Sequence, residues 1–78
     1  MKKLTLRDSV ARTVEKYIHD LDGEIPSDGI YKKIIRETEI ALFSFVYAHE
    51  KGNQSNATKL LGISRATFRQ KLKDFDLM

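Results

Sequence analysis

The feature that most constrains this chain is the stretch Ile40–Ala48, IALFSFVYA, in which apolar residues occupy almost every position. It lies in the second half of a predicted helix that begins near Ile30, with Ser27 or Asp28 as its cap, and continues until Gly52 offers a left-handed position. A helix that is apolar on nearly every side must be enclosed on every side. The other helices of a 78-residue chain can hardly supply that enclosure. We therefore predict an obligate homodimer with this segment near its axis.

A second long helix is predicted from about Leu6 to Leu21, where apolar residues recur at spacings of three and four. Thr5 and Asp8 have the spacing of a capping box at its start. The following segment, Asp22–Gly29, holds the only proline and reads as a loop between the two long helices. We expect the dimer core to draw on both helices, through Val10, Val14, Ile34, Ile35, Leu42, Phe45 and Val46.

The composition excludes several classes of protein. The chain has no cysteine, which removes disulfides, thiolate metal sites and thiol catalysis, and suits a reducing cytoplasm. No segment is long and apolar enough to span a membrane. His19 and His49 stand alone, and the chain lacks a phosphate loop and a nucleophile beside a histidine. We expect no enzyme, metal, cofactor, small-molecule ligand or membrane partner.

Positive charge is concentrated in the C-terminal third. The formal net charge is +3, from 14 basic and 11 acidic residues. Residues 51–78 hold six of the basic residues, and their first acid is Asp74. The preceding fifty residues are close to neutral. If the chain binds a polyanion, the C-terminal third is the part that binds it.

Two short helices are predicted in this basic third, over residues 54–61 and 65–73, with Asn53 and Ser64 as caps. Three residues beginning with Gly62 separate them, which is the spacing of a helix-turn-helix motif over about 53–75. The seam expected to bury this motif consists of Ala57, Leu60, Leu61, Ile63, Phe68, Leu72 and Phe75.

The outward face of the second short helix has cations, hydrogen-bonding side chains and a small alanine, and it suits entry into a DNA major groove. Arg65 lies in the first turn, where its planar guanidinium can hold O6 and N7 of guanine together. Asn53 and Ser55 lie beside free backbone N–H groups that suit a phosphate. A solvated surface helix is the alternative interpretation of this face. The remaining residues interpreted as phosphate contacts are Thr67, Arg69, Lys71 and Lys73.

The segment GNQSNATKLLGISRATFRQKLKDFDL resembles the C-terminal DNA-binding segment of the Fis family, and the same type of segment closes the sigma-54-dependent activators. The resemblance to Fis extends through LRDSV at Leu6–Val10 and covers most of the chain. It implies an all-α, four-helix subunit whose two long helices intertwine in a homodimer and whose last two form the motif. By position it implies base contacts from Ser64, Arg65 and Gln70, and phosphate contacts from Asn53, Ser55, Thr67, Arg69, Lys71 and Lys73.

The function implied is that of a sequence-tolerant, DNA-bending nucleoid protein of the bacterial cytoplasm that regulates transcription, with double-stranded DNA and RNA polymerase as partners. Ser64, Gln70 and Asp74 replace an asparagine, a lysine and a basic residue, which predicts weaker affinity or altered site preference. Only five residues precede LRDSV, so stimulation of recombination is not carried over. The alternatives are the targeting module of a sigma-54-type activator and a helical adaptor that does not bind DNA.

Overall fold

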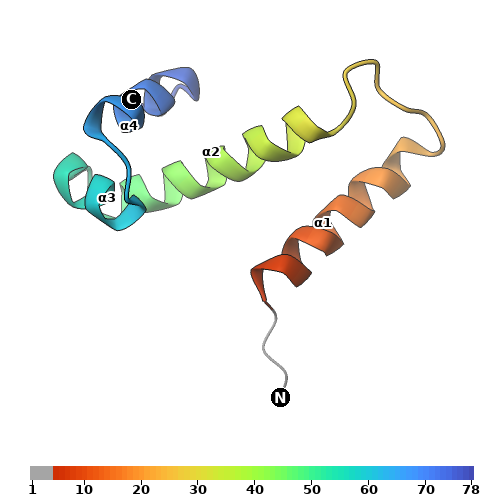
Figure 1. Ribbon diagram of the computed structural model, residues 1–78, viewed down its shortest axis with the longest axis horizontal. Helices are drawn as coiled ribbons and strands as arrows, with labels where there is room; N and C mark the ends of the chain where they lie inside the picture. Colours follow the sequence, from red (N-terminus) through yellow and green to blue (C-terminus); the bar gives the residue numbers. More distant parts are fainter. Residues whose placement is uncertain (1–4) are drawn as a thin grey trace. The chain divides into compact units, whose positions relative to one another are not determined.

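The computed structural model describes residues 5–78, which fold entirely into helices and connections (Figure 1). The helices are α1 (Leu6–Leu21), α2 (Tyr31–His49), α3 (Gln54–Leu61) and α4 (Arg65–Asp74), and no strand occurs among the described residues. The predicted all-α class and four-helix subunit are confirmed, and the intertwined homodimer remains a prediction. Within residues 5–78, no helix combines the length and the apolar character needed to cross a bilayer.

The chain forms two compact units that divide within α2. The N-terminal unit, Met1–Ile34, contains α1, the loop and the first turn of α2, and the C-terminal unit is Ile35–Met78. The sequence predicts a single domain over residues 1–78, with dimerisation helices at about 6–50 and the motif at 53–75. The C-terminal unit includes the second half of α2 because this half packs against the motif: Phe43 and Val46 belong to the same core as Phe68.

Helix α1 has the bounds predicted for it because both of its ends are capped. The hydroxyl of Thr5 accepts the N–H of Asp8 at 3.1 Å, and the Asp8 carboxylate accepts the N–H of Thr5 at 3.2 Å. This reciprocal pair is the predicted capping box. At the other end Asp22 adopts a left-handed conformation, with φ of 51°, and donates to the carbonyl of His19. Local hydrogen bonds therefore define this helix.

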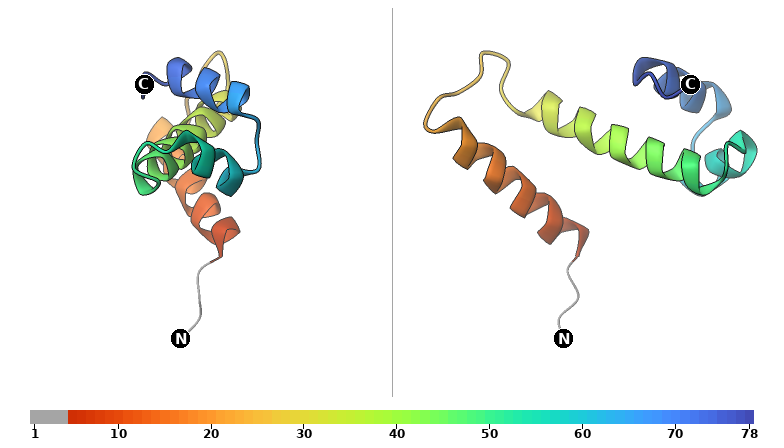
Figure 2. Two further views of the ribbon diagram at one scale, coloured as in Figure 1. Left: turned by 90° about the vertical axis from the view of Figure 1, so that its left-hand side faces the viewer. Right: turned by 180° about the vertical axis from the view of Figure 1, so that it is seen from behind.

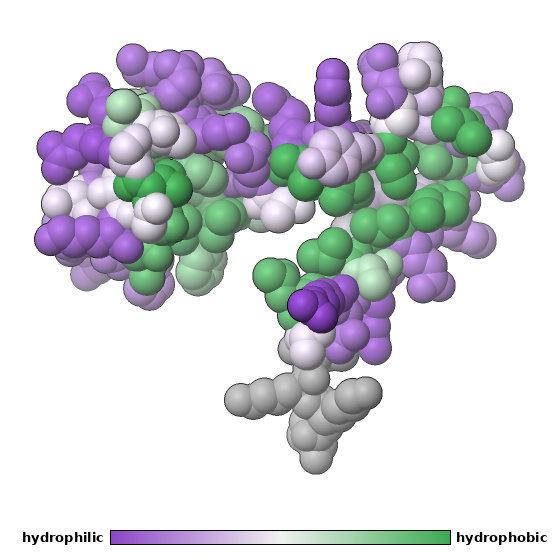
Figure 3. All heavy atoms as spheres, viewed as in Figure 1, coloured by the Kyte–Doolittle hydropathy of each residue, from purple (hydrophilic) through white to green (hydrophobic). Residues whose placement is uncertain are grey.

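The N-terminal unit covers very little of its own apolar surface. No side chain of α1 is buried, and Leu6 and Ile18 are 80% and 55% exposed. Hydrophobic atoms follow one side of α1 and hydrophilic atoms the other (Figure 3). The ammonium of Lys33 lies 5.7 Å from the ring centroid of Tyr17, which is a polar rather than a hydrophobic attachment. The apolar side of α1 thus remains largely uncovered within its unit.

Helix α2 begins at Tyr31, and neither of the caps that we predicted serves it. Its first backbone hydrogen bond runs from the N–H of Ile34 to the carbonyl of Ile30 at 2.9 Å. Ser27 and Asp28 lie upstream in a turn, separated from the helix by Gly29 with φ of 71°. The cap prediction was wrong because that left-handed glycine breaks the helical path before Tyr31.

Helix α2 ends at His49, and the chain turns sharply after it. Lys51 and Gly52 both have positive φ, 54° and 81°, and the N–H of Gly52 donates to the carbonyl of Tyr47 at 3.0 Å. The left-handed conformation predicted for Gly52 is confirmed. The two positive φ values redirect the chain into Asn53, which caps α3.

The C-terminal unit has a hydrophobic core of its own, centred on α4. Phe68 has no exposed surface, and its ring stacks on that of Phe43 with centroids 5.7 Å apart. Tyr47 and Phe75 add edge-to-face contacts, to Phe68 at 6.0 Å and to Phe43 at 6.1 Å respectively. Helix α4 is thereby fastened to the second half of α2 by aromatic packing. The five buried hydrophobic residues are Phe43, Val46, Ala57, Phe68 and Leu72.

Two placements differ from the sequence predictions. Leu60, expected in the buried seam of the motif, is 62% exposed, whereas its neighbour Leu61 packs against the core. Val46, expected in the dimer core, is only 6% exposed because the helix-turn-helix of its own chain covers it. Val46 therefore has little exposed surface that a second subunit could contact. The other residues assigned to the dimer core keep accessible surface, and Phe45 is 68% exposed.

Candidate nucleic-acid interface

Helices α3 and α4 meet through a tight turn that the sequence dictates. Gly62 ends α3 in a left-handed conformation, with φ of 73°, and its N–H donates to the carbonyl of Thr58 at 2.8 Å. The N–H of Ile63 reaches the same carbonyl at 3.2 Å. Ser64 then caps α4. The predicted helix-turn-helix is present, and the views from two further directions show α3 and α4 beside the C-terminal end of α2 (Figure 2).

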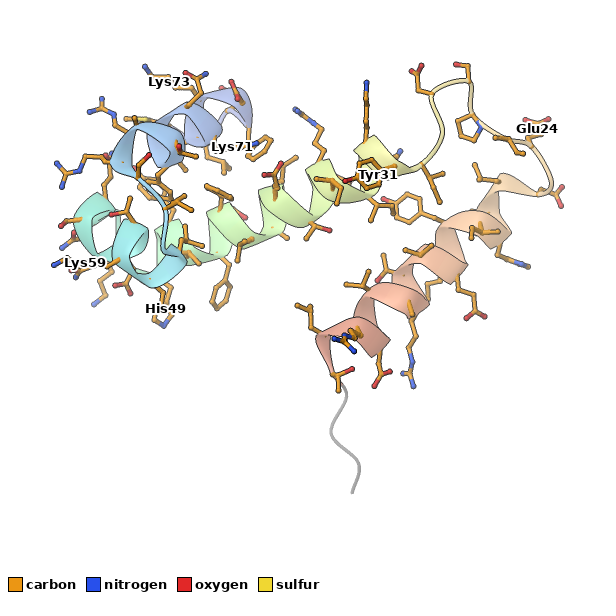
Figure 4. All side chains as sticks on the ribbon, viewed as in Figure 1. Glu24, Tyr31, His49, Lys59, Lys71 and Lys73 are labelled. Atoms are coloured by element: carbon orange, nitrogen blue, oxygen red, sulfur yellow. The ribbon has the colours of Figure 1, made fainter. Side chains whose placement is uncertain are left out.

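The cations predicted to meet DNA are mostly free on α4. Arg65, Arg69 and Lys73 are exposed, and within residues 5–78 no acidic side chain pairs with any of them. Lys73 extends from the side of α4 that faces away from α2 (Figure 4). Because Phe68 and Leu72 of the same helix are fully buried, this cationic surface is presented by a fixed backbone. The helix can bring three positive charges to one anionic surface.

Ser64 and Thr67 form a local hydrogen-bonded pair at the first turn of α4. The Ser64 hydroxyl accepts the N–H of Thr67 at 3.1 Å and donates to the Thr67 hydroxyl oxygen at 3.0 Å. The hydroxyl hydrogen of Thr67 then points away from Ser64 and is available to a phosphate oxygen. This geometry favours the phosphate contact predicted for Thr67. The Ser64 hydroxyl, by contrast, is already engaged in capping the helix.

Gln70, predicted as a base contact, is tied to an acid on the same face. Its side-chain amide nitrogen donates to the carboxylate of Asp74, one helical turn later, at 2.8 Å. A carboxylate only accepts hydrogen bonds, so this contact orients the amide and leaves the carbonyl oxygen of Gln70 outward. Asp74 also places a negative charge beside the cations of α4. Both features reduce what this part of the helix offers to an anionic ligand.

Lys71 does not lie with the other predicted phosphate contacts. Its ammonium is 3.0 Å and 3.2 Å from the two carboxylate oxygens of Glu39, in the middle of α2. In Figure 4 it lies on the side of α4 next to α2, opposite Lys73. The charge of Lys71 is therefore already paired inside the C-terminal unit. Its spacing of three from Phe68 and four from Phe75 puts it beside the buried face, but Arg65 and Arg69 have similar spacings from Phe68 and Leu72, so the spacing alone does not single out Lys71.

The start of α3 presents a second polar site. The carbonyl oxygen of the Asn53 side chain accepts the N–H of Asn56 at 3.0 Å, which caps the helix and leaves the Asn53 amide hydrogens outward. Ser55 follows in the first turn, half-buried, and its backbone carbonyl accepts the hydroxyl of Thr58. Asn53 and Ser55 thus lie with the N-terminal N–H groups of α3, the arrangement that was predicted as a phosphate site.

Sequence reasoning missed the α2 residues that support this surface. Phe43 was treated as part of a helix enclosed by a second subunit, yet it is 5% exposed within its own chain and stacks on Phe68. Glu39 was counted only in the charge balance, yet it pairs with Lys71. Phe43 follows Glu39 by four positions, so both lie on one side of α2. That shared side was the available signal.

The sequence profile and the relatives that match this chain all point to one family. Residues 46–75 match the sequence profile described as "Bacterial regulatory protein, Fis family". A protein of Xylella fastidiosa strain Temecula1, named as Fis-like and DNA-binding, is 49% identical over 76 residues, 97% of this chain and 83% of that protein. A similarly named protein of Pseudomonas aeruginosa is 43% identical over 74 residues, 95% of this chain and 70% of that protein. DNA-binding protein Fis of Glaesserella parasuis serovar 5 is 38% identical over 72 residues, 92% and 72% of the two chains.

Proposed function

This chain belongs to the Fis family of bacterial regulatory proteins, and from that premise we propose that it binds double-stranded DNA as a homodimer through the major groove. In this proposal α4 is the recognition helix. Arg65 is the main base contact, with Ser64 and Gln70 beside it. Thr67, Arg69 and Lys73 hold phosphates from α4, and Asn53 and Ser55 hold them from the start of α3.

The proposal rests on the exposed, unpaired cations of α4, a helix that is anchored in the core by two buried side chains. Among the described residues Arg65, Arg69 and Lys73 have no acidic partner, although the chain contains eleven acidic residues. Phe68 and Leu72 fix the helix that carries them. A rigid cationic helix that follows a glycine turn has the chemistry of a recognition helix. Arg65 supports base readout because it occupies the first turn of α4.

Homodimer formation is supported by the apolar surface that the chain leaves uncovered. Val10, Ile35, Leu42 and Phe45 are between 37% and 68% exposed, and all four were predicted for the dimer core. Monomeric proteins rarely leave such surface open to water. A second copy would bury it and supply two recognition helices related by twofold symmetry.

Two symmetric recognition helices also give a reason to bend DNA. Successive major grooves on one side of B-DNA are about 34 Å apart, and a dimer with a shorter helix separation must curve the duplex or narrow its minor groove. Since most of the proposed contacts are to phosphates, binding tolerates many sequences. We propose a nucleoid protein of the bacterial cytoplasm that regulates transcription by shaping DNA, with RNA polymerase as a further candidate partner.

The test is a salt titration of DNA binding by the purified chain, with its solution mass measured in parallel. Only cationic contacts release counterions, and Arg65, Arg69 and Lys73 supply about six cations per dimer, which predict a slope of roughly −5 in log affinity against log salt concentration. The affinity should then fall by about 10³ between roughly 50 and 200 mM salt. A chain that ignores duplex DNA in dilute buffer contradicts the proposal and favours a protein adaptor. A monomeric mass at the binding concentration contradicts the dimer.

A further inference from the structure

Lys71 is separated from the other cations of α4 by its partner. Both carboxylate oxygens of Glu39 lie close to its ammonium, at 3.0 Å and 3.2 Å, although the two residues are 32 positions apart in the chain. The two side chains are 34% and 31% exposed, so each is about two-thirds covered. A phosphate contact from Lys71 would require this pair to open. The geometry therefore indicates that Lys71 links α4 to α2 within the protein.

The ion pair is one part of a cluster between α2 and α4, which consists of Arg36, Glu39, Lys71 and Phe75. The ring of Phe75 receives two cations: the guanidinium of Arg36 is 5.3 Å from its centroid, and the ammonium of Lys71 is 5.7 Å away. Arg36 and Glu39 are three residues apart on one side of α2, whereas Phe75, the C-cap of α4, follows Lys71 by four residues. Four side chains thus join the end of α4 to the middle of α2.

This cluster lies where it controls the tilt of the recognition helix. Phe68 and Leu72 anchor α4 in the core, and Lys71 lies between them in the sequence and adds a contact to the middle of α2. Arg65 is six residues before Lys71, about 9 Å along the helix at 1.5 Å per residue. The two anchors hold one side of the helix, so loss of the contact beside them would let α4 tilt about that side. Such a tilt would displace the side chain of Arg65.

We propose that Lys71 is a positioning residue, which sets the orientation of α4 through Glu39 and does not contact DNA. This inference rests on the proposed function, since the orientation matters only if α4 reads DNA. It deepens that function by assigning sequence discrimination to a pair remote from the bases. Lys71 and Glu39 together determine how accurately Arg65 meets a base edge, whereas Lys73 supplies affinity for the phosphates.

A charge-swap experiment separates positioning from phosphate binding. The variants are Glu39→Lys, Lys71→Glu and the double variant Glu39→Lys/Lys71→Glu, with Glu37→Lys as the control. Glu37 is an exposed carboxylate on the same helix two positions away, so its reversal makes the same change in net charge without touching Lys71. Binding is measured on the tightest duplex selected from a random pool and on a scrambled duplex of equal composition, at a temperature where every variant is folded.

Positioning predicts that each single variant lowers the ratio of selected to scrambled affinity and that the double variant restores it. A loss of up to about fivefold per subunit compounds to about 25-fold for a dimer. Glu37→Lys should leave the ratio unchanged. If the pair acted only on folding, affinity for both duplexes would fall by the same factor and the ratio would stay constant, which would contradict positioning.

A phosphate contact predicts the opposite pattern. Glu39→Lys would then raise affinity more than Glu37→Lys does, since it frees Lys71, and the double variant would bind as poorly as Lys71→Glu. The neutral variant Lys71→Gln adds a second measurement: a phosphate contact reduces the salt slope by about 0.9 per subunit, and a positioning residue leaves it unchanged. If the unaltered chain binds no duplex, the proposed function fails. Thermal unfolding of the three charge-swap variants and of Glu37→Lys then still shows whether the swap restores the α2–α4 contact.

Discussion

The two units of this chain differ in how they are stabilised, although both are helical. In the N-terminal unit, α1 has no buried side chain. A capping box stabilises its first turn, and its apolar side chains lie on one exposed face. The C-terminal unit encloses Phe68 and Leu72 completely with only three short stretches of helix. The C-terminal unit therefore has a core of its own, although Ile35, Leu42 and Phe45 stay exposed in it, whereas α1 has no buried side chain.

The difference indicates a division of labour within 78 residues. A recognition helix must present its cations in a fixed geometry, so it benefits from a complete local core. A dimerisation helix must keep its apolar face available until the second subunit arrives. In the proposed dimer, helix α2 would serve both needs, since Phe43 packs in the core of the motif at 5% exposure while Phe45 remains 68% exposed. Single substitutions in the two units can separate these two roles.

The largest effect is expected from Phe45→Ser, which should abolish the dimer. Removal of a buried phenylalanine side chain costs about 3–5 kcal/mol, and a symmetric interface holds two copies. Sedimentation equilibrium should show the mass falling to that of one chain. Leu60→Ser is the matched control, because Leu60 is 62% exposed but was not assigned to the interface. Equal behaviour of the two variants would contradict the assignment of Phe45 to the dimer.

The next largest effect is expected from Phe68→Ala, within the C-terminal unit. Phe68 is fully buried and contacts the rings of Phe43 and Tyr47, so the cavity should lower the free energy of unfolding by about 3–5 kcal/mol. Urea denaturation measures this, and DNA affinity should fall with it. Met78→Ala, in the same unit at a 52% exposed side chain, should change stability by less than about 0.5 kcal/mol. A small effect of Phe68→Ala would mean that the motif does not depend on its own core.

Arg65→Ala and Lys73→Ala should weaken DNA binding in different ways. Loss of the Arg65 guanidinium should cost about 1–3 kcal/mol and reduce discrimination at one base pair. Loss of Lys73 should weaken all duplexes alike and lower the salt slope by about 0.9 per subunit. Competition between the selected and scrambled duplexes distinguishes the two outcomes. Identical losses of discrimination would refute the separate roles given to the two cations.

A smaller effect is expected at the start of α1, from Thr5→Ala. The Thr5 hydroxyl accepts the N–H of Asp8, and loss of such a cap costs about 0.5–2 kcal/mol. Because α1 has no buried side chain of its own, this local bond should contribute visibly to the thermal stability of the dimer. Thr5→Ser retains the hydroxyl and should behave as the unaltered chain. If Thr5→Ala changed nothing, packing in the dimer would outweigh the cap.

The smallest effect is expected from Asp74→Asn, and it should be a gain. The carboxylate of Asp74 is exposed on α4 and accepts the side-chain amide of Gln70. Removing its charge should strengthen DNA binding by up to about fivefold, since surface charge interactions contribute at most about 1 kcal/mol. Asp76→Asn removes one charge beyond α4 and should have less effect. Weaker binding by Asp74→Asn would show that orienting Gln70 outweighs the charge.

Local patterns in the sequence were enough to define most of the fold. Thr5, Asn53 and Ser64 are caps because the side-chain oxygen of each accepts the N–H three residues later, and Gly62 ends α3 because it tolerates a positive φ. Such interactions involve near neighbours in the chain. The bounds of α1 and α3 and the polar surface of α4 could therefore be predicted, whereas the cap of α2 and the burial of Leu60 were misjudged.

Contacts between distant residues were decided by the tertiary structure alone. Lys71 is one cation among several in the sequence, and only the packing of α4 on α2 brings it 3.0 Å from Glu39 and away from the DNA-binding face. Likewise Val46 and Phe45 are adjacent apolar residues, yet the motif covers the first and leaves the second. Helical periodicity places a residue on one side of its helix, but which neighbour covers that side depends on how the helices pack, and that information is distributed over the whole unit.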